Sequence, residues 1–202
     1  MAVRRATATA AAVVLGLTVS GCSSSGDASS TALTSLTSSP SSSAAPTAAN
    51  RSQDAQSEAV AFVPTYLGMI DDLRLDPSRP LDDIYQVAVA PEATAQASAI
   101  GELRSQTYRQ TGRSRLVTAA VEGAPGNSDV AAAPPRLPTV VVSACVDVTD
   151  VGAVDAAGQS VVPPGRPGFL IAQLTMVNPR QIDASSWRVS EAVNRQAQSC
   201  SG

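Results

Sequence analysis

The period of the hydrophobic pattern changes once along this chain, near Gly112, and that change limits the folds open to it. Before Gly112, apolar residues recur every three or four positions over 52–73, which predicts an amphipathic helix. Two further helices, each opened by a proline, are predicted over 80–85 and 91–109. After Gly112 the spacing alternates with period two, which indicates strands. The predicted strands cover residues 116–121, 139–148, 169–177 and 187–189.

Helices followed by strands favour an α+β domain, with the helices on one face of an antiparallel sheet of about four strands. One face of the strand over 139–148 carries Val140, Val142, Ala144, Val146 and Val148. We expect this face to cover the helices and the opposite face to be partly wet. Pro64 lies inside the first predicted helix, so we expect a bend or a restart there.

The chain begins with the pattern of a bacterial export signal. Two arginines precede an uncharged stretch over 6–20, which is shorter than the roughly 20 residues that a membrane-spanning helix needs. The stretch ends in Val19-Ser20-Gly21-Cys22, which resembles the lipobox of bacterial lipoproteins. The resemblance implies removal of residues 1–21, acyl chains on Cys22, and a lipid anchor on the extracytoplasmic face of the cell membrane. Residues 22–50 are rich in Ser, Thr and Ala and predict a disordered tether, which leaves 51–202 as one domain.

The chain contains no histidine, and this excludes Ser-His-Asp triads, Cys-His nucleophiles and histidine-ligated zinc. A glycine-rich phosphate loop is also missing, so we expect no nucleotide cofactor. The adjacent carboxylates of Asp71-Asp72 and Asp82-Asp83 point to different faces of a helix, so we expect no metal site there. Seventeen acidic residues against fourteen basic ones argue against a nucleic-acid partner. With Cys22 lipidated, Cys145 and Cys200 form an even pair in an oxidising compartment, and a disulfide between them is the natural expectation.

Four short segments resemble the nuclear transport factor 2-like domain, which includes SnoaL-like and ketosteroid-isomerase-like proteins. They are Tyr66-Leu67-Gly68-Met69-Ile70-Asp71, Cys145-Val146-Asp147-Val148, Val154-Asp155-Ala156-Ala157-Gly158 and Trp187-Arg188-Val189. The resemblance covers about residues 52–200 and is strongest to envelope lipoproteins of high-GC Gram-positive bacteria. It implies helices packed on a curved antiparallel sheet, a cystatin-like cone.

Enzymes of that superfamily place an acid inside the cone, often helped by a tyrosine, which makes five residues candidates. They are Asp147, Asp71, Asp72, Tyr66 and Tyr85. We interpret Asp147 as a solvated or hydrogen-bonded strand residue, and the pairs Asp71-Asp72 and Asp82-Asp83 as solvated helix ends close to Arg74 and Arg79. Tyr66, Tyr85 and Trp187 are the candidate pocket residues, with the two tyrosines at the mouth of the cone. No residue is assigned a catalytic role.

Three functions fit these observations. The first is a non-enzymatic, membrane-anchored envelope lipoprotein whose domain binds a protein partner or has a structural role. The second is a module that binds a small apolar molecule or lipid in the cone. The third is a histidine-free isomerase or dehydratase. They differ in what the interior of the cone contains.

Overall fold

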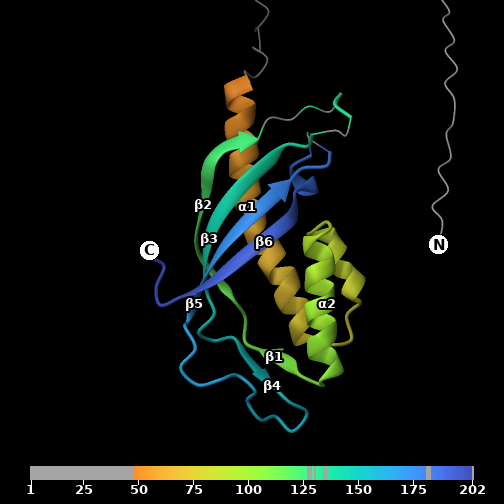
Figure 1. Ribbon diagram of the computed structural model, residues 1–202, viewed down its shortest axis with the longest axis vertical. Coiled ribbons are helices and arrows are strands. Elements are labelled where there is room, and N and C mark those ends of the chain that lie inside the picture. The colour runs from red at the N-terminus through yellow and green to blue at the C-terminus, as the bar shows by residue number, and fades with distance from the viewer. Residues whose placement is uncertain (1–47, 127–128, 130, 134–135, 181–182, 202) are drawn as a thin grey trace, which may run out of the picture. The chain divides into compact units, whose positions relative to one another are not determined.

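Figure 1 shows a computed structural model of the chain, which describes residues 48–201 apart from 127–128, 130, 134–135 and 181–182. The predicted signal peptide, Cys22 and the predicted tether up to residue 47 lie outside the described residues. The described residues belong to one compact unit. None of its helices is long and apolar enough to cross a membrane.

Three helical elements open the described chain, in the order that the sequence predicts. α1 spans Ala48–Leu75, the 3-10 helix η1 spans Leu81–Gln86, and α2 spans Glu92–Ser105. α1 continues through Pro64 without interruption, so the helix does not restart there. α2 ends four residues earlier than predicted, because Thr107 has a positive φ of 58° that a helix does not accommodate.

Four strands form the main antiparallel sheet, in the order β2-β3-β5-β6. They are β2 (Arg115–Gly126), β3 (Thr139–Asp147), β5 (Phe169–Val177) and β6 (Arg188–Ala197). The predicted α+β fold is confirmed, and the curved sheet lies against α1 with α2 near its edge (Figure 1). β6 continues well beyond the predicted residue 189, because pairing with β5 along its whole length holds a segment that is otherwise polar.

A second, two-stranded sheet was not predicted. It pairs β1 (Arg109–Thr111) with β4 (Gly152–Val154), close to the end of α2 (Figure 1). Strands of three residues are too short to carry a visible period. Together they fix the segments that lead into β2 and out of β3.

The core lies between α1 and the inward face of the sheet. Val140, Val142 and Ala144 on β3 are at most 1% exposed, which confirms the predicted face. The other main contributors from α1 and β5 are Ala59, Val63, Tyr66, Ile70, Leu73, Ala172, Leu174 and Met176. On the outward face, Ser143 pairs with Gln173, and both are at least partly exposed. The sheet is therefore buried on one face and wet on the other.

A disulfide joins Cys145 on β3 to Cys200 beyond the end of β6, with the two Cα atoms 5.6 Å apart. This is the expected pairing. The bond connects the C-terminal segment to the centre of the sheet across 55 residues of chain.

Asp147 closes β3 and is 8% exposed. Its Oδ1 accepts hydrogen bonds from the Thr149 hydroxyl at 2.6 Å and the Thr149 backbone N–H at 2.9 Å. Its Oδ2 accepts one from the Arg115 guanidinium. These donors lower the pKa of Asp147 to about 2, with Thr149 as the largest contributor. The position agrees with the interpretation of Asp147 as a hydrogen-bonded strand residue.

The Asp147 contacts predict a pH-dependent contribution to stability. A carboxyl with a lowered pKa stabilises the fold fully above its unfolded value of about 3.9, and that contribution is lost as the pH falls through about 2. Asp147→Asn should therefore be less stable than the wild type at pH 7, and the difference should shrink between about pH 4 and 2. Urea unfolding across this range measures it, with Asp150→Asn, an exposed neighbour, as the control. A difference that stays constant with pH would contradict the assignment.

Candidate functional site

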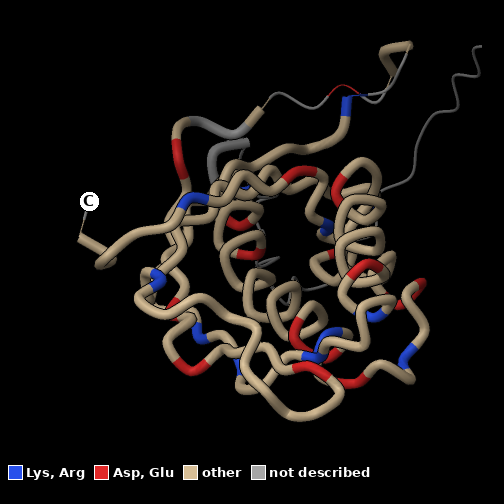
Figure 2. The backbone as a smooth tube through the Cα atoms, turned by 60° about the horizontal axis from the view of Figure 1, so that its bottom comes forward, with Lys and Arg blue, Asp and Glu red and all other residues tan. Residues whose placement is uncertain are grey.

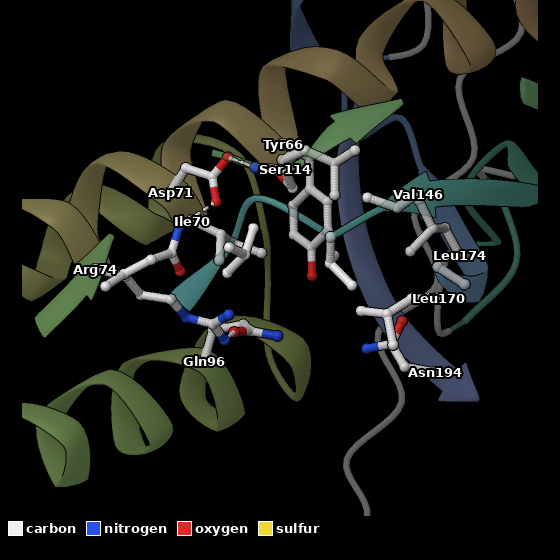
Figure 3. A pocket seen from close by; sticks show the side chains of 15 residues that line it. Tyr66, Ile70, Asp71, Arg74, Gln96, Ser114, Val146, Leu170, Leu174 and Asn194 are labelled. Carbon is white, nitrogen blue, oxygen red and sulfur yellow. Dashed lines mark hydrogen bonds between the residues drawn. The ribbon is translucent and has the colours of Figure 1, made fainter. Parts of the chain in front are cut away.

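A cavity of about 90 Å³ lies between α1 and the inward face of the sheet, and we call it the inner cavity (Figure 3). Its apolar lining comes from α1, β3, β5 and the turn after β3. These residues are Leu67, Ile70, Val146, Val148, Val151, Leu170, Ala172 and Leu174. The sheet residues that line the cavity point inward, as the core residues of the same strands do. The alternation along each strand therefore supplies both the core and one wall of the cavity.

Tyr66 lines the inner cavity and is 2% exposed. Its hydroxyl donates a hydrogen bond to Oε1 of Glu92, the first residue of α2. Burial, with the neighbouring carboxylate as a smaller cause, raises the pKa of Tyr66 far above its usual value. The phenol therefore stays protonated at physiological pH and acts as a fixed donor.

Glu92 is 6% exposed and accepts three hydrogen bonds. Besides the Tyr66 hydroxyl, its donors are the Gln96 side-chain amide at 2.8 Å and the backbone N–H of Ala192 on β6 at 3.1 Å. The N-terminus of α2 also favours a negative charge at this position. Glu92 thus joins α1, α2 and β6 through one carboxylate.

Asp71 is the second buried carboxylate, at 5% exposure, and the interpretation as a solvated helix end is wrong for it. Its oxygens accept hydrogen bonds from the Gln110 amide at 2.7 Å and from the backbone N–H and hydroxyl of Ser114, both at 2.8 Å. α1 continues to Leu75, so Asp71 lies inside the helix and faces the segment between β1 and β2. Asp72, its neighbour, pairs with Arg79 at 2.8 Å and is the partly exposed member of the pair.

Arg74 lines the inner cavity together with Gln96 (Figure 3). The guanidinium donates one hydrogen bond, to Oε1 of Gln96 at 3.1 Å. Within the described chain, no carboxylate lies within ion-pair distance of it. Burial lowers the pKa of Arg74, although nearby Asp71, Tyr66 and Glu92 act in the opposite direction. An arginine remains charged under such conditions, so a half-buried cation faces the cavity.

A second cavity of about 280 Å³, which we call the outer cavity, shares Arg74, Gln110 and Val151 with the inner one. The two cavities therefore adjoin. The remaining lining of the outer cavity is Ala99, Leu103, Gly152, Ala153, Val162 and Arg166. The outer cavity lies next to α2 and the β1-β4 sheet. The strands of that sheet are too short to show a period, so the sequence pattern did not indicate this cavity.

The three candidate pocket residues are not brought together. Tyr66 lines the inner cavity, whereas Tyr85 is 49% exposed on η1, where the turn buries its neighbour Ile84 instead. Trp187 is fully buried in the core, and its indole N–H donates to Glu58 at 3.2 Å. Neither Tyr85 nor Trp187 lines the inner cavity with Tyr66.

Sequence reasoning missed several polar residues of the site, chiefly Gln96 and Gln110, which line the cavities, and Glu92, which bonds to Tyr66 and Gln96. The spacing of four between Glu92 and Gln96 places both on one face of a helix, and this was the available signal. No group of three or more histidine, cysteine or acidic residues that could hold a metal ion occurs among the residues that the structure describes.

No family model matches this chain, and no curated protein matches it. Among solved structures, the intermembrane space region of the chloroplast protein ARC6 is similar with a TM-score of 0.48 and 10% identity, covering 70% of this chain and 97% of that one. Aln2 from a Streptomyces species is similar with a TM-score of 0.39 and 18% identity, covering 69% of this chain and 88% of that one. At these scores neither likeness identifies a family or an activity, and the resemblance to nuclear transport factor 2-like domains stays a prediction.

Proposed function

We propose that this chain is a lipid-anchored extracytoplasmic binding protein whose domain holds the apolar end of a small molecule in the inner cavity. The observation that carries the proposal is the cavity itself. Protein interiors leave few voids larger than a water molecule, and one of about 90 Å³ has room for about three waters. Eight of its fifteen lining residues are apolar and come from α1, β3, β5 and the turn after β3, and these walls suit the apolar part of an organic ligand.

The hydrogen bonds of the two buried carboxylates, Asp71 and Glu92, favour binding over catalysis. Asp71 and Glu92 each accept three hydrogen bonds from the protein, out of about four that a carboxylate can accept. A general base needs a free lone pair directed at its substrate. Both carboxylates hold secondary-structure elements together instead, and this is why we rank the isomerase or dehydratase hypothesis below binding.

Hexanol, a short uncharged probe, tests the binding proposal. The full chain carrying Cys22→Ala, which removes competing acyl chains, should bind hexanol and shift the methyl NMR signals of Val146, Leu170 and Leu174. Ala172→Leu adds three carbon atoms to the cavity wall and should abolish these shifts while the domain stays folded. Ala120→Leu makes the same change at an exposed position of β2 and should bind as the wild type does. Equal binding by Ala172→Leu and the wild type would refute the proposal.

The lipid anchor is tested at Cys22. Two or three acyl chains bury many methylene groups at about 0.8 kcal/mol each, so anchoring should be effectively permanent. Wild-type protein should be found in the membrane fraction with the added mass of the acyl chains, and Cys22→Ala should lose both properties. Ser23→Ala is the matched control and should behave as the wild type. Retention of Cys22→Ala in the membrane fraction would disprove anchoring at this residue.

The outward face of the sheet supports a second candidate, which is the binding of a protein partner. Val193 on β6 is 56% exposed and Val117 on β2 is 46% exposed. A photoreactive residue at position 193 would capture a partner in intact cells if this face is used. Such a capture that persists in Ala172→Leu would favour this candidate over small-molecule binding.

A further inference from the structure

We infer that the ligand is an amphiphile with an anionic head group, a carboxylate or a phosphate, held between Arg74 and Arg166 in the outer cavity. This inference rests on the proposed binding function and adds the chemical class of the ligand. The apolar end of the molecule lies in the inner cavity. The head group lies in the outer cavity, where solvent can reach it.

The volumes of the two adjoining cavities fit a ligand that occupies both. The inner cavity of about 90 Å³ accepts about three heavy atoms, at about 30 Å³ for each water-sized group. The outer cavity of about 280 Å³ adjoins it through Arg74, Gln110 and Val151. Small-molecule sites usually measure about 300 Å³ or more, so neither cavity alone is large for a ligand, while the two together reach that size.

Arg74 stands at the junction of the two cavities. A guanidinium has five N–H donors, and the structure gives Arg74 one acceptor, Gln96. By contrast, Arg79, Arg113, Arg115 and Arg180 each have a carboxylate within 4.0 Å. Arg74 is also half-buried, and an ionic contact is stronger there than on the surface. A carboxylate or a phosphate matches its unused donors, because either can accept two parallel N–H bonds from a guanidinium.

Arg166 supplies the second cation. Its Nη2 donates to the backbone carbonyls of Val148 and Val151, which holds the turn after β3 against the cavity. No carboxylate of the described chain lies within ion-pair distance of Arg166. Its positive charge is therefore positioned but not neutralised by an ion pair.

The charges that line the outer cavity have one sign. Its lining contains Arg74 and Arg166 and no acidic residue among those described. Elsewhere, acidic and basic residues are interspersed around the domain (Figure 2). Asp71 and Glu92 lie close enough to act on Arg74 and keep their negative charges, but neither lines the outer cavity. The outer cavity therefore suits an anion, and the apolar walls at Ala99, Leu103 and Val162 suit the chain that carries it.

Four probes with the same six-carbon chain test the inference on the full chain carrying Cys22→Ala. Hexanoate and hexyl phosphate represent the two sources of the oxyanion, hexanol is neutral, and hexylamine is cationic. By calorimetry, at least one of the two anions should bind on the order of tenfold tighter than hexanol, the usual effect of a charged hydrogen bond. Hexylamine should bind most weakly. The tighter of the two anions identifies the head group.

Variants at Arg74 separate charge from folding. Arg74→Gln should lower the ratio of anion to hexanol affinity by about tenfold, whereas Arg74→Lys, which keeps the charge, should retain part of it. Arg195→Gln removes an exposed arginine on β6 and should keep the wild-type ratio. If the wild type binds hexanol as tightly as both anions, the anionic head group is wrong and the apolar-binding proposal stands. If no probe binds, both are wrong.

Discussion

Replacing Glu92 with alanine is expected to lower the free energy of unfolding by about 3 kcal/mol, because buried donors would lose their acceptor. The Tyr66 hydroxyl, the Gln96 amide and the Ala192 backbone N–H all donate to this carboxylate. Leaving even one buried polar group unpaired costs about 1–3 kcal/mol. A domain of this size has a total stability of roughly 5–15 kcal/mol, so the loss should be plain in urea unfolding.

Glu102→Ala is the matched control for this experiment. Glu102 lies on the same helix, is exposed, and accepts one hydrogen bond from the exposed Gln106 at 2.6 Å. Surface changes of this kind usually alter stability by less than about 0.5 kcal/mol. If Glu92→Ala and Glu102→Ala cost the same, Glu92 does not join α1, α2 and β6 as described.

Removing the disulfide should have the largest effect on stability. Closing a loop of 55 residues restricts the unfolded chain and contributes about 4 kcal/mol in the chain-entropy model. The double variant Cys145→Ala with Cys200→Ala should therefore unfold at a clearly lower urea concentration than the oxidised wild type. A reducing agent should bring the wild type to the level of the variant.

The double variant is its own control, because a reducing agent should leave its stability unchanged. A difference below about 1 kcal/mol between the oxidised and reduced wild type would show that β5 alone holds β6 and the tail. In that case the bond would protect the C-terminus without stabilising the sheet.

The buried network also connects the stability of the domain to the proposed ligand site. Glu92 accepts from Nε2 of Gln96, and this orients the Oε1 that accepts from Arg74. Glu92, which lines neither cavity, thus positions the Arg74 guanidinium through Gln96. A ligand that binds the folded domain should in turn raise its stability in proportion to the logarithm of ligand concentration.

The hydrophobic period was sufficient to predict the helices and the four-stranded sheet that they cover. Val140, Val142 and Ala144 alternate so regularly that the buried face of β3 was determined by spacing alone, and the cysteines left one natural pair. The β1-β4 sheet escaped prediction because its strands are too short to show a period. β6 was predicted too short because its C-terminal half is largely polar and is held in a strand by pairing with β5.

The site was less predictable, because tertiary contacts decide which polar residues are buried. Asp71 and Asp72 are adjacent carboxylates on different faces of α1, and the positions of Ser114 and Gln110, which the sequence does not reveal, make Asp71 the buried one. Tyr66 and Tyr85 are likewise both tyrosines among apolar neighbours, yet one is 2% exposed and the other 49%. Composition excluded histidine chemistry, but it did not locate the cation at Arg74.

Native mass spectrometry of the protein isolated from its native cells tests the central claim most directly. If the inner cavity holds the end of a small molecule, wild-type protein should carry a non-covalent adduct that is released by collisional activation. Ala172→Leu, which fills that cavity, should lack the adduct, while Ala120→Leu should retain it. Spectra in which the wild type repeatedly appears without an adduct, indistinguishable from Ala172→Leu, would contradict the account.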